Sequence, residues 1–129
     1  MKKVLILALL LIIPGIGMAD NHGEVVVEMW KCELKDGKEM KDVEATNQKW
    51  LAMTRKTTGS EDVQSFMMNP VVGTLTKFVF ADVYPDMATW AKVKSAEETD
   101  EGQAIEAAFN DLMDCTDNRL YESKRTNVE

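Results

Sequence analysis

The chain offers little thiol or imidazole chemistry, since it contains two cysteines, Cys32 and Cys115, and one histidine, His22. A catalytic cysteine needs a histidine or another cationic neighbour to lower the pKa of its thiol. His22 precedes the first segment that is typical of a strand, which separates it from both cysteines. Two cysteines in a chain that carries an export signal are usually joined. We therefore expect a Cys32–Cys115 disulfide rather than a nucleophile or a metal ligand.

Glu28 and Asp82 are the carboxylates that could support acid–base catalysis. Each lies among aromatic and β-branched residues in a segment typical of a strand. If the two groups are close together and poorly solvated, one of them could hold a raised pKa and act as an acid or a base. The alternative is an exposed pair that contacts water or a lysine of a partner. Both interpretations stay open from the sequence.

Two other groups of residues have the composition of metal sites. Met67 and Met68, with further methionines, would suit copper(I), but there is no Met-x-x-Met spacing and no histidine nearby. The acidic residues at 97, 98, 100 and 101 lack the spacing of a calcium loop. We expect the methionines to fill the core and the acidic residues to flank a helix start, so we predict no metal and no cofactor.

The N-terminus has the pattern of a secretory signal peptide. Lys2 and Lys3 precede the apolar run 4–13, and small residues follow up to Ala19. The apolar run is shorter than the ~20 residues that span a bilayer. We predict a signal peptide over 1–19 and cleavage after Ala19. The mature chain would have no stable membrane insertion and a periplasmic or secreted location. A retained N-terminal anchor is the alternative.

Residues 20–129 are enough for one domain with one core. The whole chain has 15 basic and 22 acidic residues and a net charge of −7. Since only Lys2 and Lys3 are charged before Ala19, the mature charge is 13 − 22 = −9. An acidic surface without a run of lysines or arginines repels phosphate backbones. We therefore expect no nucleic-acid partner.

Hydrophobic periodicity predicts the element order β-α-β-β-α-β. The predicted elements are strands over 25–33, 62–72, 74–84 and 118–125, a helix from Met40 to Gly59, and a helix after Asp86 that is broken at 95–99 and resumes with a capping box of Asp100 and Gln103. Pro70 marks the second strand as an edge strand. This order is the α+β, ferredoxin-like arrangement, with a four-stranded antiparallel sheet and helices on one face. Its first and last strands are antiparallel neighbours, which would bring Cys32 and Cys115 together.

Alternation along the strands divides the sheet residues between two faces. One face would carry Val25, Val27, Met29, Val79, Ala81 and Val83, and the other Val26, Glu28, Trp30, Phe78, Phe80 and Asp82. We expect the helices to cover the small aliphatic set. The aromatic set would then be exposed over a large area, which a second copy of the chain would cover. This predicts a homodimer packed sheet to sheet.

Three short stretches carry a family resemblance: residues 36–40 (DGKEM), residues 84–86 (YPD) before a tryptophan-bearing helix, and Asp114-Cys115. The chain resembles the dimeric α/β-barrel superfamily, which includes antibiotic-biosynthesis-type monooxygenases and haem-degrading enzymes. More narrowly, it is similar to small exported bacterial proteins of unknown function. Haem degradation in the superfamily uses an iron-ligating histidine, which the predicted domain core lacks. Its cofactor-independent oxygenases place polar and aromatic residues around a pocket.

We expect the chain to bind a small apolar or aromatic ligand between its helices and its sheet. The residues expected to line that pocket are Trp30, Phe78, Phe80, Asn47, Trp50 and Tyr84. One alternative is a cofactor-independent oxygenase or isomerase that uses Glu28 or Asp82 as its base. Another is an envelope protein that binds a partner through its sheet. The resemblance transfers no catalytic residue to this chain.

Overall fold

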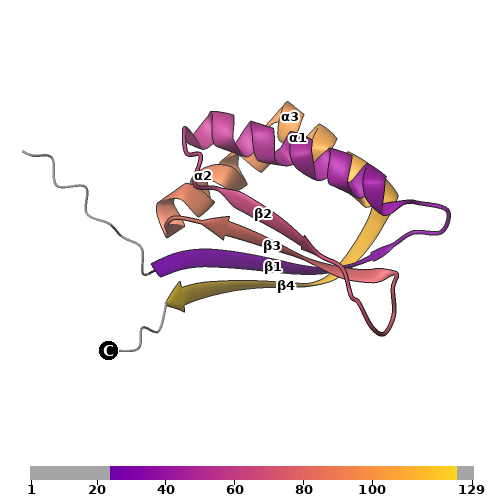
Figure 1. Cartoon of the computed structure of the whole chain (residues 1–129). Helices are drawn as coiled ribbons and strands as arrows, with labels where there is room; N and C mark the ends of the chain where they lie inside the picture. Colours follow the sequence, from indigo (N-terminus) through magenta and orange to yellow (C-terminus); the bar gives the residue numbers. More distant parts are fainter. Residues whose placement is uncertain (1–23, 125–129) are drawn as a thin grey trace, which may run out of the picture.

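The structure is a computed structural model that describes residues 24–124 (Figure 1). Its elements are β1 (Glu24–Leu34), α1 (Met40–Thr58), β2 (Gln64–Met68), β3 (Lys77–Tyr84), α2 (Met87–Glu97), α3 (Asp100–Leu112) and β4 (Met113–Lys124). The predicted signal peptide, its cleavage after Ala19 and the position of His22 lie outside the described residues.

The four strands form one antiparallel sheet in the order β2-β3-β1-β4. This confirms the predicted ferredoxin-like fold, and β2 is an edge strand that ends at Met68, before Pro70. The other edge strand, β4, is longer than expected because it begins at Met113, directly after α3. Met113 has an extended backbone and pairs with Leu34, so Cys115 lies inside the strand rather than before it.

The helix ends follow local capping chemistry. Gly59 ends α1 in the left-handed region with φ 67°, as the sequence indicates. Asp86 caps α2 by accepting a hydrogen bond from the backbone N–H of Thr89. The predicted capping box at the start of α3 is wrong. Thr99 is the N-cap, one residue before Asp100, and its Oγ1 accepts from the backbone N–H of Gly102.

The three helices cover one face of the sheet (Figure 1). Two groups of buried side chains lie between the layers. One consists of Val26, Trp50, Met53, Val63, Tyr84, Val93, Ala96 and Ile105. The other consists of Cys32, Val43, Phe78, Phe80 and Met113. Phe109 packs against both groups, so α3 joins them into one core.

The predicted assignment of the two sheet faces is wrong. Phe78, Phe80 and Glu28 are buried beneath the helices, whereas Val27 and Val79 on the other face are only partly buried. Large aromatic side chains remove more apolar surface from water, so they stabilise the fold more when they face the helices. The two carboxylates on the helix-covered face, Glu28 and Asp82, both accept hydrogen bonds from other side chains.

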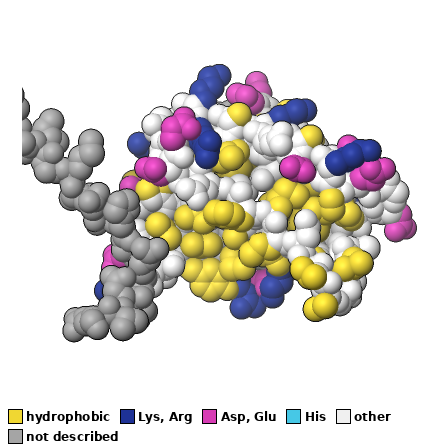
Figure 2. All heavy atoms as spheres, in the orientation of Figure 1, with side chains coloured by type: hydrophobic (Ala, Val, Ile, Leu, Met, Phe, Trp, Pro, Cys, Tyr) yellow, Lys and Arg dark blue, Asp and Glu magenta, His cyan; other side chains and the backbone are white. Residues whose placement is uncertain are grey.

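The face of the sheet that no described helix covers is mostly apolar, and we call it the open face. It carries Val25, Val27, Met29, Phe66, Met68, Val79, Ala81, Val83 and Tyr121. Phe66 is 50% exposed and Met68 is 43% exposed. Figure 2 shows hydrophobic side chains gathered over the strands and again at the β2–β3 connection, where Val71 and Val72 are almost fully exposed.

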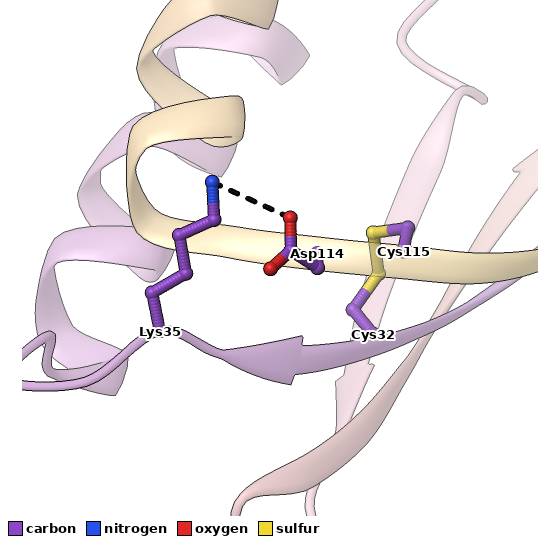
Figure 3. The surroundings of a disulfide bond; sticks show 4 residues. All are labelled: Cys32, Lys35, Asp114 and Cys115. Carbon is purple, nitrogen blue, oxygen red and sulfur yellow. Dashed lines mark ion pairs between the residues drawn. A yellow bond between two sulfur atoms is a disulfide. The ribbon is translucent and has the colours of Figure 1, made fainter.

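Cys32 and Cys115 are cross-strand partners on β1 and β4, and their sulfurs form a disulfide (Figure 3). The pairing register shifts between Lys31 and Cys32, next to the bond. Beside it, Lys35 forms an ion pair with Asp114 at 3.3 Å. A disulfide between neighbouring strands is compatible with an exported protein.

None of the helices between residues 24 and 124 is long and apolar enough to span a membrane.

Candidate functional site

A cavity of about 210 Å³ lies between the helix-covered face of the sheet and helices α1 and α3. Its lining residues are Trp30, Asn47, Trp50, Phe80, Asp82, Glu97, Gly102, Ile105, Glu106, Phe109, Asn110, Met113 and Cys115. Because Glu106, Asn110 and Cys115 are exposed, one end of the cavity reaches solvent. A dry cavity of about 150 Å³ can hold benzene, so this space is sufficient for a compound with one ring.

Four of the six residues predicted for a ligand pocket meet at this cavity. Trp30 comes from β1, Phe80 from β3, and Asn47 and Trp50 lie one turn apart on α1. The other two, Phe78 and Tyr84, do not line it. Phe78 is buried in the core around Cys32, and Tyr84 is fully buried at the opposite end of β3.

Helix α3 contributes a wall of the cavity that was not predicted from the sequence. Ile105, Phe109 and the polar residues Glu106 and Asn110 form its α3 wall. The spacing of Ile105 and Phe109 was visible in the sequence, but it indicates only an inward-facing helix stripe. No sequence signal separates a residue that lines a cavity from one that fills the core.

Glu28 is a buried carboxylate whose two oxygens both accept hydrogen bonds. Its Oε2 accepts from Lys94 Nζ at 2.8 Å, from Trp90 Nε1 at 3.2 Å and from Tyr84 Oη at 3.4 Å. Its Oε1 accepts from Asn118 Nδ2 at 2.9 Å. These donors come from three different elements, α2, β3 and β4. Glu28 therefore ties the layers together and is not among the residues that line the cavity.

Lys94 and Glu97 connect the buried carboxylate of Glu28 to the cavity. Lys94 Nζ lies 3.0 Å from Glu97 Oε2, and the other oxygen of Glu97 accepts from Trp50 Nε1 at 3.0 Å. Burial alone would lower the pKa of Lys94, but the hydrogen bond that Lys94 donates to Glu28 and the charge of Glu97 outweigh it and raise that pKa. Lys94 is therefore a permanent ammonium group, shared by two carboxylates.

Asp82 lines the cavity and has a different environment. Its Oδ1 accepts one hydrogen bond, from Ser65 Oγ at 2.5 Å, and Ser65 in turn accepts from Asn47 Nδ2 at 3.0 Å. Burial raises the pKa of Asp82 to about 7, the Ser65 hydrogen bond opposes the increase, and the charge of Glu28 adds to it. A carboxyl group with this pKa can both donate and accept a proton near neutral pH.

The structure thus separates the two carboxylates that the sequence treated as equivalent. Glu28 is held by four donors, one of them a lysine, whereas Asp82 has one hydroxyl donor and borders a cavity. Perturbed carboxyl groups in clefts are candidates for function. Between residues 24 and 124, no group of three or more histidine, cysteine or acidic side chains is placed to hold a metal ion.

Solved structures with the same fold include enzymes and proteins of unknown function. The cofactor-independent oxygenase SnoaB from Streptomyces nogalater has a TM-score of 0.61 at 13% identity, over 83% of this chain and 99% of SnoaB. A NIPSNAP family protein from Agrobacterium tumefaciens has a TM-score of 0.56 at 16% identity, over 75% of this chain and 90% of that protein. An uncharacterised NIPSNAP domain protein from Burkholderia xenovorans has a TM-score of 0.54 at 16% identity, over 78% of this chain and 94% of that protein.

No family model and no curated protein matches this sequence. At 13 to 16% identity the similarities to solved structures show the fold alone. They agree with the ferredoxin-like arrangement that the sequence predicts.

Proposed function

We propose that this chain binds a small apolar or aromatic ligand in the cavity between its sheet and helices α1 and α3. The observation that carries the proposal is the composition of the lining, in which aromatic rings surround a few polar groups. Trp30, Trp50, Phe80 and Phe109 supply the rings, and Asp82 is the buried polar group. Small-molecule sites typically combine mostly apolar walls with a small number of placed polar side chains.

Indole, an uncharged aromatic probe, tests the proposal by NMR titration. It should cause saturable shifts at residues that line the cavity. Asn110→Trp, which adds bulk at the exposed end of the cavity, should weaken this binding by about tenfold or more, since ~1.4 kcal/mol of lost contact is a factor of ten. Ala104→Trp is the matched control, because Ala104 is exposed on the same helix and does not line the cavity.

The cavity would not be the binding site if the chemical-shift changes caused by indole do not saturate. The same conclusion would follow if indole binds Asn110→Trp and Ala104→Trp equally well. Native mass spectrometry of protein purified without reductant would complement the titration. A retained ligand would appear as extra mass and would begin to identify the compound.

A second function, a cofactor-independent oxygenase or isomerase, is supported by the position of Asp82. Its carboxyl group borders the cavity and has a pKa near neutrality, so it could remove a proton from a bound ligand. SnoaB, which shares the fold, is an oxygenase that needs no cofactor. If this function is correct, the wild-type chain consumes the retained ligand in air and Asp82→Asn does not, whereas ligand binding alone leaves the compound unchanged in both.

We also propose that the chain forms a homodimer through its open face. Phe66 and Met68 are exposed beside Val79 and Ala81, and together they form an apolar area on a face without described helices. Areas of this kind mark interfaces. A second copy packed sheet to sheet would cover it. This dimer keeps the predicted sheet-to-sheet packing, but its interface is the open face rather than the face that carries Phe78 and Phe80.

Light scattering coupled to gel filtration tests the dimer. The wild-type chain should elute with twice the chain mass, and Phe66→Glu should shift it to the monomer because the charge would be buried in the interface. Met87→Glu is the control, since Met87 is comparably exposed at the start of α2 and lies off the open face. A wild-type monomer would contradict the dimer and would favour a different envelope partner for the open face.

The N-terminal pattern and the disulfide together support a periplasmic or secreted location. Cell fractionation with mass measurement of the mature N-terminus tests both the location and the cleavage after Ala19. Recovery of an uncleaved chain from the cytoplasm would contradict them.

A further inference from the structure

The charge of the cavity has a consistent sign. Its lining includes three carboxyl side chains, Asp82, Glu97 and Glu106, and no lysine, arginine or histidine. Asp82 contributes from β3, Glu97 from the end of α2 and Glu106 from α3, so the carboxyl groups reach the space from three elements. A small anion entering this space would meet like charge on several sides.

The ammonium groups near this charge are already paired. At the exposed end of the cavity, Lys35 Nζ contacts the backbone oxygen of Asn110 and forms an ion pair with Asp114. Lys94 lies 2.8 Å from Glu28 and 3.0 Å from Glu97, so its single positive charge is shared by two carboxylates. Among the described residues, neither Asp82 nor Glu106 forms an ion pair. The surroundings of the cavity therefore carry excess negative charge, which favours a cation.

The aromatic walls favour the same type of ligand. Trp30, Trp50, Phe80 and Phe109 border the cavity, and the faces of such rings attract cations within about 6 Å of the ring centre. Lys94 Nζ lies 5.8 Å from the centre of the Trp30 ring, so this ring already interacts with one ammonium group. Carboxylates combined with aromatic walls can bind both the charge and the apolar body of an organic cation.

We propose that the cavity selects a small organic cation, an amine with an apolar or single-ring body whose ammonium group lies against Asp82. The inference rests on the proposed ligand binding and names the class of that ligand. The volume of about 210 Å³ limits the body to about one ring. The carboxyl groups exclude carboxylates and phosphates of similar size.

Binding of such an amine should depend on pH through Asp82. Burial raises the pKa of Asp82 to about 7, so its carboxyl is mostly protonated at pH 6 and mostly ionised at pH 8. The charged groups around it are Glu28 from β1, Lys94 and Glu97 from α2, and Glu106 across the cavity, while the buried phenol of Tyr84 stays neutral because burial raises its pKa. An ammonium ligand should therefore bind more tightly at pH 8 than at pH 6.

Three probes of one size test the proposal: benzylamine, benzyl alcohol and benzoate. Their dissociation constants would be measured by NMR titration at pH 6 and pH 8, where benzylamine remains an ammonium ion. At pH 8 benzylamine should bind roughly tenfold more tightly than benzyl alcohol, and benzoate should bind more weakly than both. The preference for benzylamine should shrink at pH 6.

Asp82→Asn should remove most of the preference and its pH dependence while benzyl alcohol still binds. Glu106→Gln should reduce the preference about twofold to threefold without any risk to folding, since Glu106 is exposed. Asp62→Asn is the control, because Asp62 is exposed and does not line the cavity.

Equal affinity for benzylamine and benzyl alcohol, with shifts that Asn110→Trp abolishes, would overturn cation selection and leave ligand binding in the cavity intact. A preference that persists unchanged in both Asp82→Asn and Glu106→Gln would also overturn it. If none of the probes binds in an Asn110→Trp-sensitive way, the proposed ligand site fails together with the inference.

Discussion

Replacing both Cys32 and Cys115 with alanine is expected to lower the free energy of unfolding by about 4 kcal/mol. The disulfide joins residues separated by 83 positions, so it restricts most of the described chain in the unfolded state. In the chain-entropy description, the stabilisation grows with the logarithm of the loop length. Urea denaturation of the wild-type and the double variant, both without reductant, measures the difference as a shift in midpoint.

Reductant provides the internal control for this prediction. It should destabilise the wild-type chain by a similar amount and leave the double alanine variant unchanged, since that variant has no bond to reduce. A loss below about 1 kcal/mol would show that the β1–β4 backbone pairing, which extends along β1 from Glu24 to Leu34, holds these two strands together without the bond.

The disulfide also shows which features of the fold follow from sequence. The order of apolar segments predicts the ferredoxin-like arrangement, and that arrangement alone brings Cys32 beside Cys115. The capping residues Gly59 and Asp86 give the C-terminal end of α1 and the start of α2, because capping depends on a few neighbouring atoms. The start of α3 was misplaced by one residue, since Thr99 and Asp100 are both good N-caps by type.

The two faces of the sheet were reversed for a different physical reason. Alternation shows which residues share a face, but it does not show which face the helices cover. The helices were expected to cover the small aliphatic side chains of the face opposite Glu28 and Asp82. The hydrogen-bond donors of these two carboxylates, such as Lys94 and Ser65, lie far from them in the sequence, so the burial of the carboxylates becomes apparent only in three dimensions.

The same limit applies to the candidate site. Aromatic and amide residues on β1, β3 and α1 could be proposed from their types, and four of the six proposed residues meet at the cavity. The distinct roles of Glu28 and Asp82 could not be predicted, because they depend on how many donors reach each carboxylate. The charge excess around the cavity depends in the same way on the double pairing of Lys94.

The second large effect concerns Asp82 and pH. In the folded chain burial raises the pKa of Asp82 from 3.8 to about 7, so between these values the folded state binds a proton that the unfolded state has released. Stability from this group is therefore present at pH 4 and is lost as the pH rises towards 8. At ~1.36 kcal/mol for each unit of pKa difference, the loss is about 4 kcal/mol.

Asp82→Asn should abolish this loss, since asparagine stays neutral and can still accept the hydrogen bond from Ser65. Urea denaturation at pH 4 and pH 8 measures the effect. The variant should match the wild-type chain at pH 4 and exceed its stability by a few kcal/mol at pH 8. Asp62→Asn, an exposed carboxyl replaced in the same way, should show no such divergence. Parallel curves for Asp82→Asn and wild-type would mean that the carboxyl is well solvated.

This pH effect bears directly on function. A buried carboxyl that destabilises the fold at neutral pH contributes less to folding than an asparagine would in the same place. If Asp82→Asn is more stable at pH 8 and also loses the preference for benzylamine, the carboxyl serves the ligand rather than the fold. If the variant is more stable but keeps the preference, the charge that attracts the amine comes from Glu97 and Glu106 rather than from Asp82.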